Sequence, residues 1–95
     1  MNQPSNQIAV PESISALQGA REILRMWRSD EGERVVLRTD DLPPAGWGLL
    51  LIDLAKHVAY AYARQGNITA NEAFGQVISG FIAELGQATD SPSPV

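Results

Sequence analysis

The longest apolar stretch of the chain, Pro44–Arg64, dominates its pattern of hydrophobic and polar positions. When successive residues are placed 100° apart around a helix axis, its large apolar side chains share one broad face. These are Trp47, Leu50, Leu51, Leu54, Val58, Ala61 and Tyr62. Pro44 suits a first helical position, and both Gly66 and Asn67 tolerate the left-handed backbone that often ends a helix. The pattern therefore predicts a central helix over these residues.

A further helix is predicted directly after the central one. Thr69 and Glu72 have the spacing of a capping box, in which two side chains satisfy free backbone N–H groups at a helix start. The apolar residues that follow recur on one helical face: Phe74, Val77, Ile78, Phe81, Ile82 and Leu85. The short link at 66–68 predicts an antiparallel helical hairpin. Gly75 and Gly80 weaken a helix interior, so we expect another backbone to approach closely there.

The pattern before residue 39 predicts a strand, a helix and a second strand. Gln7–Val10 is a short apolar run closed by a proline, which is typical of an edge strand or an extended lead-in. Ser15 and Gln18 have the capping-box spacing, and apolar residues at helical spacing follow: Ala16, Ala20, Ile23, Leu24 and Trp27. Residues 29–32 are predicted to form a turn. Glu33–Arg38 contains adjacent valines and a leucine, which favour a strand.

These elements predict one α+β domain over residues 7–87, in the order strand, helix, strand, helix, helix. We expect a small two-stranded or intermolecular β ribbon covered by three helices. Two arrangements are open: the two strands pair as a right-handed βαβ unit, or the second strand has no partner in its own chain. Residues 1–6 are predicted to be flexible and residues 88–95, which contain two prolines, to be disordered.

Either arrangement leaves backbone groups unpaired at a strand edge, which predicts pairing with a second copy across a two-fold axis. Centring that pairing on Val35 sets Arg34 against Val36, whereas centring on Val36 would oppose like charges. On the central helix, Leu49 and Ile52 lie off the main apolar face. We therefore expect a homodimer or higher oligomer. Its predicted interface comprises Arg34, Val35, Val36, Leu37, Leu49 and Ile52.

Composition and charge narrow the classes of function. The chain of 95 residues is 44% hydrophobic and 19% charged, as expected of a folded protein, and its lack of cysteine removes disulfides and thiolate metal sites. The net charge is −4 and the arginines are interleaved with acidic residues, unlike the basic field of a nucleic-acid binder. The first ten residues lack the basic start and apolar run of a secretion signal. Because the most apolar stretch carries charges in its middle, we expect no membrane span and a cytoplasmic location.

Candidate chemistry converges only on what we call the polar seam, Asp53, His57, Tyr60 and Arg64, on one side of the central helix. The first two are four residues apart, so the carboxylate can meet the imidazole and fix its tautomer. The phenol and guanidinium make binding of a small polar or anionic ligand the alternative function. A single histidine supplies too few metal ligands, and no nucleophile elbow, G-x-G-x-x-G or P-loop is present. We therefore predict no metal, no cofactor and no catalytic residue.

The segment WGLLLIDLAKHVA at 47–59, preceded by the strand ERVVLRT, resembles a family of small bacterial domains of unknown function. The resemblance extends over most of the chain, from Ile8 to Leu85. It implies a bacterial cytosolic protein and a shared role for Trp47, Asp53 and His57, and it transfers no activity and no functional residue. Self-association in a structural or regulatory role is accordingly the function that we predict first.

Overall fold

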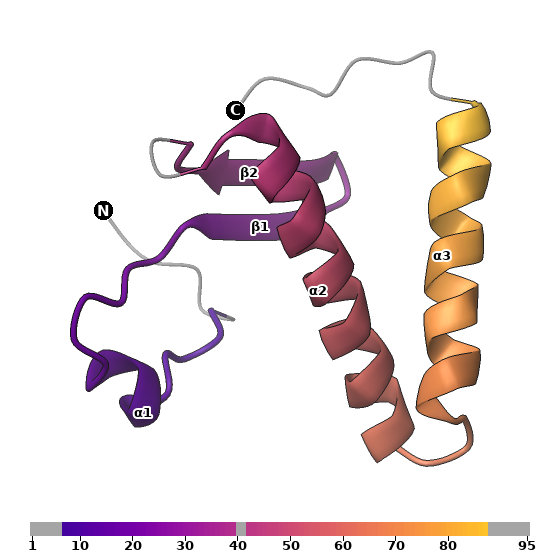
Figure 1. Ribbon diagram of the computed structural model, residues 1–95, viewed down its shortest axis with the longest axis horizontal. Coiled ribbons are helices and arrows are strands. Elements are labelled where there is room, and N and C mark those ends of the chain that lie inside the picture. Colours follow the sequence, from indigo (N-terminus) through magenta and orange to yellow (C-terminus); the bar gives the residue numbers. More distant parts are fainter. Residues whose placement is uncertain (1–6, 40–41, 88–95) are drawn as a thin grey trace.

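The computed structural model describes residues 7–39 and 42–87 (Figure 1). Its elements are α1 (Glu12–Ser15), β1 (Leu24–Ser29), β2 (Gly32–Leu37), α2 (Pro44–Arg64) and α3 (Ala70–Gly86). The two strands form one antiparallel sheet, so the predicted α+β class with a two-stranded ribbon and three helices is confirmed. The predictions for residues 1–6 and 88–95 lie outside the described residues.

The first half of the chain differs from the sequence prediction. Ser15 ends a single helical turn instead of starting a long helix, and Gly19 then takes a left-handed φ of 79°. Leu24–Ser29 is a strand, β1, that pairs antiparallel with β2. The predicted helix is wrong because a neighbouring strand needs a hydrogen-bonding partner, and the pairing energy outweighs the weak preference of single residues for helix.

Of the two alternatives predicted for Gln7–Val10, the edge strand is wrong, because these residues have no regular structure and are exposed. The βαβ unit is therefore absent from the described part of the chain, and the second predicted strand has a partner in its own chain. The observed order is helix, strand, strand, helix, helix. The pairing that forms is the local one, between strands separated by a tight turn, which costs the least loop-closure entropy.

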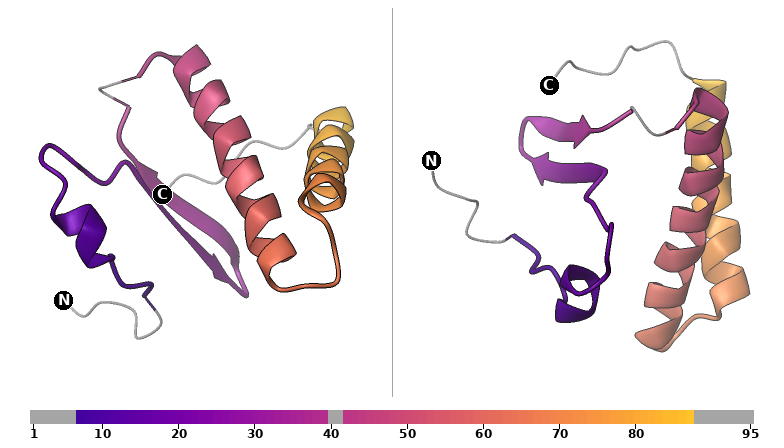
Figure 2. Two further views of the ribbon diagram at one scale, coloured as in Figure 1. Left: turned by 60° about the horizontal axis from the view of Figure 1, so that its bottom comes forward. Right: turned by 60° about the vertical axis from the view of Figure 1, so that its left-hand side comes forward.

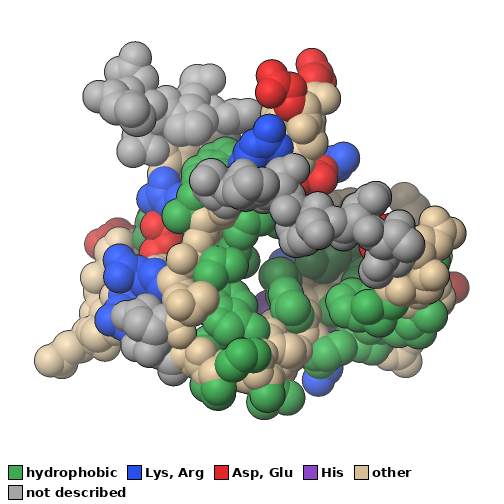
Figure 3. All heavy atoms as spheres, turned by 90° about the horizontal axis from the view of Figure 1, so that it is seen from above, with side chains coloured by type: hydrophobic (Ala, Val, Ile, Leu, Met, Phe, Trp, Pro, Cys, Tyr) green, Lys and Arg blue, Asp and Glu red, His purple; other side chains and the backbone are tan. Residues whose placement is uncertain are grey.

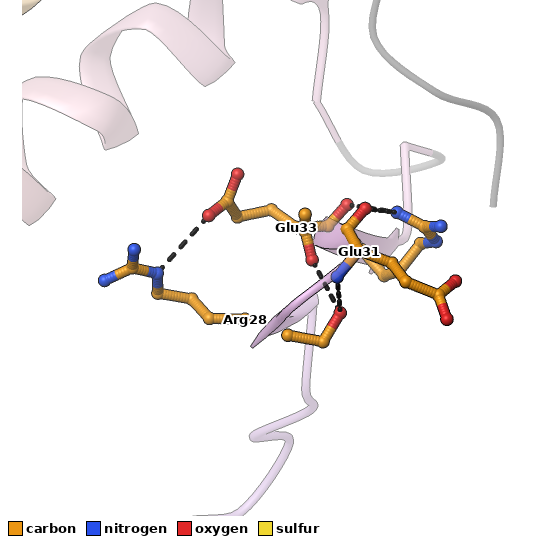
Figure 4. Close-up of polar contacts among 6 residues, drawn as sticks. Arg28, Glu31 and Glu33 are labelled. Carbon is orange, nitrogen blue, oxygen red and sulfur yellow. Dashed lines mark hydrogen bonds and ion pairs between the residues drawn. The ribbon is translucent and has the colours of Figure 1, made fainter.

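The turn between β1 and β2 is held by its own side chains (Figure 4). The Ser29 hydroxyl donates to the carbonyl oxygen of Gly32 at 3.0 Å and accepts from the backbone N–H of Glu31 at 3.2 Å. Gly32 has a φ of 101°, a conformation that residues with a Cβ rarely adopt. The Ser29 hydroxyl and the Gly32 conformation together fix the register in which Ser29 opposes Gly32.

The helical hairpin of α2 and α3 confirms the prediction for the second half of the chain. Pro44 is at the start of α2, and Gly66 and Asn67 after its end have left-handed φ values of 87° and 73°. Figure 1 shows the two helices close together near their connecting loop and separating toward their other ends. In the described chain, Ala59 and Ala73, one on each helix, are the only buried hydrophobic residues, at 2% and 4% exposure. The core is therefore small and lies along α2 and α3.

The β hairpin and the helix pair are loosely joined. Figure 2 shows the β hairpin beside α2, with α3 on the other side of α2. No Cα atom of β1 or β2 lies within 8 Å of a Cα atom of α2 or α3, and neither strand has a buried residue. The broad apolar face predicted for α2 is accordingly only partly covered, with Leu51, Leu54 and Tyr62 exposed.

The approach of another backbone that we expected at Gly75 and Gly80 is not found among the described residues. No heavy atom lies within 4 Å of the place where a Cβ would be at either glycine. Separately, none of the helices in the described ranges is long and apolar enough to cross a lipid bilayer.

The capping box at the start of α3 is confirmed. The Thr69 hydroxyl accepts from the Glu72 backbone N–H at 3.1 Å, and the Glu72 carboxylate accepts from the Thr69 N–H at 3.0 Å. The hydrogen bonds from the Thr69 backbone and side chain hold the pKa of Glu72 below its usual 4.5. The ionised form of this carboxyl group therefore stabilises the start of α3.

This shift predicts a pH dependence of stability. A carboxyl group whose pKa is lower in the folded state contributes stability above its unfolded-state pKa and loses it as pH falls through the folded-state value. In thermal unfolding from pH 7 to pH 3, Glu72→Gln should be less stable than the parent at pH 7, and the difference should shrink as acid protonates Glu72. Thr69→Ser, which keeps a hydroxyl at the cap, is the control and should retain the parent's profile. A constant difference between Glu72→Gln and the parent at every pH would contradict the prediction.

Candidate functional site

The first pair of the polar seam forms as predicted. His57 Nε2 lies 3.4 Å from Asp53 Oδ2, one turn apart on α2. The two side chains are 74% and 66% exposed, so water competes for both groups. The carboxylate can orient the imidazole, but the pair stands on open helix surface.

The other two members of the polar seam, Tyr60 and Arg64, lie on the same side of α2 and are also exposed. Neither side chain has a hydrogen bond or ion pair to another described residue. Over residues 7–39 and 42–87, no three histidine, aspartate or glutamate side chains come close enough together to hold a metal ion. The seam thus gathers an imidazole, a carboxylate, a phenol and a guanidinium on one surface without walls that would hold a substrate.

A groove of about 430 Å³ lies on a different part of the molecule, along β1. The consecutive residues Leu24–Arg28 line it, and Gln7, Ile8 and Val10 of the N-terminal segment also contribute. Consecutive residues of a strand point to opposite faces, so a groove that touches all of them follows the strand's edge. The groove was not predicted, because the sequence pattern indicates a helix over these residues. The alternation of Leu24 and Met26 just before a turn was the available signal.

Two arginines line the groove, and both have acidic partners. Arg25 Nε is 2.8 Å from Glu22 Oε2, and Arg28 Nε is 3.3 Å from Glu33 Oε2 (Figure 4). Each positive charge is therefore balanced by a nearby carboxylate. The arrangement matches a solvated, ion-paired surface more closely than a site for anions.

The residues predicted for an oligomer interface are mainly exposed. Arg34 is held by its own hairpin, where Nη1 donates to the carbonyl oxygens of Glu33 at 3.1 Å and Glu31 at 3.4 Å. Val35 is half-buried. The remaining predicted residues are exposed apolar side chains, with Leu49 the most exposed at 76%: Val36, Leu37, Leu49 and Ile52. The fold of one chain thus leaves these apolar groups available for contact.

The exposed apolar surface is larger than the sequence predicted. Phe81, Ile82 and Leu85 were assigned to the packed face of α3, yet all three are exposed because α2 and α3 separate along this half of the helix. Leu51 and Leu54 are exposed in the matching half of α2. Figure 3 shows hydrophobic side chains gathered around a hollow on the face seen from above. The spacing of hydrophobic residues predicts which face of each helix is apolar. It does not predict how much of that face the other helix covers.

One buried polar atom also lacks a partner. Trp47 Nε1 on α2 is buried and finds no hydrogen-bond acceptor among the described residues. Buried donors are ordinarily paired, because an unpaired one costs about 1–3 kcal/mol. An unpaired Trp47 N–H would therefore cost the fold this much, and water or a second chain can supply an acceptor.

Comparison with known proteins identifies relatives of the whole fold. A family model described as "Domain of unknown function (DUF5076)" matches residues 7–89. A solved structure titled as a "putative pyruvate dehydrogenase" from the photosynthetic bacterium Rhodopseudomonas palustrus CGA009 is 34% identical. It covers 100% of this chain and 97% of its own, with a TM-score of 0.72. No functionally curated protein matches. The resemblance stated from the WGLLLIDLAKHVA segment is confirmed, and the chain belongs to the DUF5076 family of domains of unknown function.

Proposed function

We propose that this protein is a small self-associating module with a structural or regulatory role, and that its partner is a second copy of the same chain. The observation that carries the proposal is the imbalance between core and surface. Among the described residues only Ala59 and Ala73 are buried hydrophobic residues. Large apolar side chains are exposed on both the β hairpin and the helices: Met26, Val36, Leu37, Leu49, Leu51, Ile52, Leu54, Phe81, Ile82 and Leu85.

The accessible surface supports the same proposal. The chain exposes 8531 Å², whereas a compact monomer of its 10.3 kDa mass exposes about 5,400 Å². Even if every residue outside the described ranges had the full exposure of an unfolded chain, about 160 Å² each, roughly 6,000 Å² would remain, against about 4,700 Å² for a compact chain of the described residues alone. A stable protein–protein interface buries about 800 Å² on each partner. The excess surface is thus of the size that a dimer removes.

The shape of the chain adds a second argument. Its radius of gyration is 15.7 Å, against about 12.4 Å for a compact chain of 95 residues. A two-stranded hairpin is marginally stable by itself and needs cover on one face. Here no strand residue is buried, so the β hairpin gains little from its own helices. Apolar cover for the β hairpin would therefore have to come from outside the described residues.

β2 pairs with β1, so neither strand is isolated, but in the two-stranded sheet of the described chain each strand keeps one open edge, as the sequence predicts. The exposed apolar side chains support association in addition. Ligand binding at the polar seam stays a prediction, since its four residues lie on an open surface. The name putative pyruvate dehydrogenase belongs to the related protein and identifies no functional residue in this chain. That relative comes from a bacterium, which supports the proposed bacterial source, and the cytoplasm remains the compartment that we propose.

Mass measured in solution tests the proposal. Light scattering on the eluting peak of a sizing column, with the protein at micromolar concentration, should give at least twice the 10.3 kDa of one chain. The measurement should be repeated in high salt, where association through apolar surface persists and association through exposed charges weakens. A mass of one chain under both conditions would contradict the proposal.

A further inference from the structure

A stripe of three large apolar residues, one glycine and one asparagine runs along α3 at the flank of the face that packs against α2. Asn71, Gly75, Ile78, Ile82 and Leu85 are separated by four, three, four and three residues, the spacing of a seam between paired helices. The buried and half-buried residues of α3, which mark its contact with α2, are Ala70, Ala73, Phe74, Val77 and Ile78. At 100° per residue the stripe, which we call the α3 seam, is centred about 90° around the helix from the middle of that contact, and Ile78 belongs to both.

Most of the α3 seam is uncovered in the described chain, and only Ile78 is half-buried. Ile82 and Leu85 are each 61% exposed. Nothing lies within 4 Å of the position that a Cβ would take at Gly75. Among the described elements, α2 is the only one with a Cα atom within 8 Å of α3. The seam contains no charged residue, so another apolar surface can cover it without burying an unpaired charge.

The order of residue sizes in the α3 seam suits antiparallel pairing with an identical helix. A two-fold axis near residue 80 sets Gly75 opposite the partner's Leu85 and Ile78 opposite the partner's Ile82. The large leucine then lies over the glycine, where space is open, and the two isoleucines meet at the centre. Parallel pairing would oppose glycine to glycine and leave a gap at one end. The antiparallel arrangement also places the helix dipoles in opposite directions, which is favourable.

We infer that two copies of this chain associate through the α3 seam, antiparallel and with Gly75 packed against the partner's Leu85. This inference rests on the proposed function, since it names the surface by which a self-associating module pairs. A second copy is the occupant because the chain's excess surface matches the area that a dimer buries, and because the seam is complementary in size to itself.

Exchange of two glycines provides a matched test. Gly75→Leu fills the space that the partner's Leu85 needs, and should raise the dissociation constant of the dimer at least tenfold. It should not weaken the chain's own fold, because leucine favours a helix over glycine and no neighbour is within 4 Å. Gly80→Leu is the control: it is the same exchange at an exposed glycine of α3 with equally open space, but about 140° around the helix. Its dimer should dissociate as the parent's does.

Sedimentation equilibrium over a range of concentrations measures the dissociation constants, and circular dichroism checks that each variant is helical. Adding Leu85→Ala to Gly75→Leu makes room for the new leucine opposite position 85 of the partner. The dissociation constant of this double variant should return toward that of the parent. Ile82→Glu is a second, independent disruption at an exposed position and should yield monomers.

The outcomes separate the inference from the proposed function. If the parent is a dimer and both Gly75→Leu and Ile82→Glu remain equally strong dimers, the α3 seam is not the interface, while self-association stands. Equal weakening by Gly75→Leu and Gly80→Leu would overturn the antiparallel contact as well. A monomeric parent would overturn both proposals.

Discussion

The Ala73→Leu variant is expected to lose about 2 kcal/mol of unfolding free energy. Ala73 on α3 is only 4% exposed, and Ala59 on α2 is only 2% exposed. Two such small residues allow the helices to approach closely near their connecting loop. A leucine at position 73 would need room for three more carbon atoms, and the helices would have to separate where they are packed best. Urea unfolding followed by circular dichroism, at one protein concentration because association adds to stability, measures the loss.

Ala83→Leu is the matched control for this prediction. Ala83 lies on the same helix and is exposed, and the exchange has the same small effect on helix propensity. Its unfolding free energy should stay within about 0.5 kcal/mol of the parent's. Equal losses for the two variants would show that the contact between α2 and α3 does not depend on a small residue at position 73.

The Gly32→Ala variant is expected to lose about 1–2 kcal/mol of unfolding free energy. Gly32 follows the turn between β1 and β2 with a φ of 101°, where a side chain strains the backbone. Steric contact does not add to the loss, because the nearest heavy atom to a Cβ at this position is Arg34 Nη1 at 3.9 Å. The loss should appear in the same urea unfolding measurement.

The Gly48→Ala variant is the control and is expected to gain unfolding free energy. Gly48 lies within α2, and no heavy atom is within 4 Å of the place that the alanine methyl group would occupy. Alanine should therefore stabilise the helix by up to about 1 kcal/mol. If Gly32→Ala raised stability in the same way, the left-handed conformation at the hairpin turn would be contradicted.

The second half of the fold was predictable because its signals are local. Pro44 starts α2, the left-handed pair Gly66 and Asn67 follows its end, and Thr69 with Glu72 caps α3. Each of these features depends on residues within one helical turn. The positions at which α2 and α3 begin and end therefore do not depend on packing between distant parts of the chain.

The first half was not predictable in the same way. Leu24 and Trp27 are three residues apart, which fits a helix, while Leu24 and Met26 alternate as in a strand. Hydrogen bonding to β2 favours the strand over the helix, and the spacing of hydrophobic residues does not predict that pairing. The turn at 29–32 is predicted correctly, but the segment before it forms a strand and not the predicted helix.

The candidate site shows the same division. The contact between Asp53 and His57 follows from helix geometry, since residues four apart share a face. The exposure of the Asp53–His57 pair, by contrast, depends on which surfaces of α2 the rest of the chain covers. The extent of the apolar surface at Ile82 and Leu85 depends on the angle between two helices, and hydrophobic spacing carries no information about that angle.

Both packed units of this protein, β1 with β2 and α2 with α3, join segments that are neighbours along the chain. Closing such short loops costs little entropy, so each hairpin can fold early and independently of the other. With association as proposed, the slow step on the way to the final assembly is the collision of two nearly finished chains. Dilution then delays the final stabilisation of the protein without slowing the closure of either hairpin.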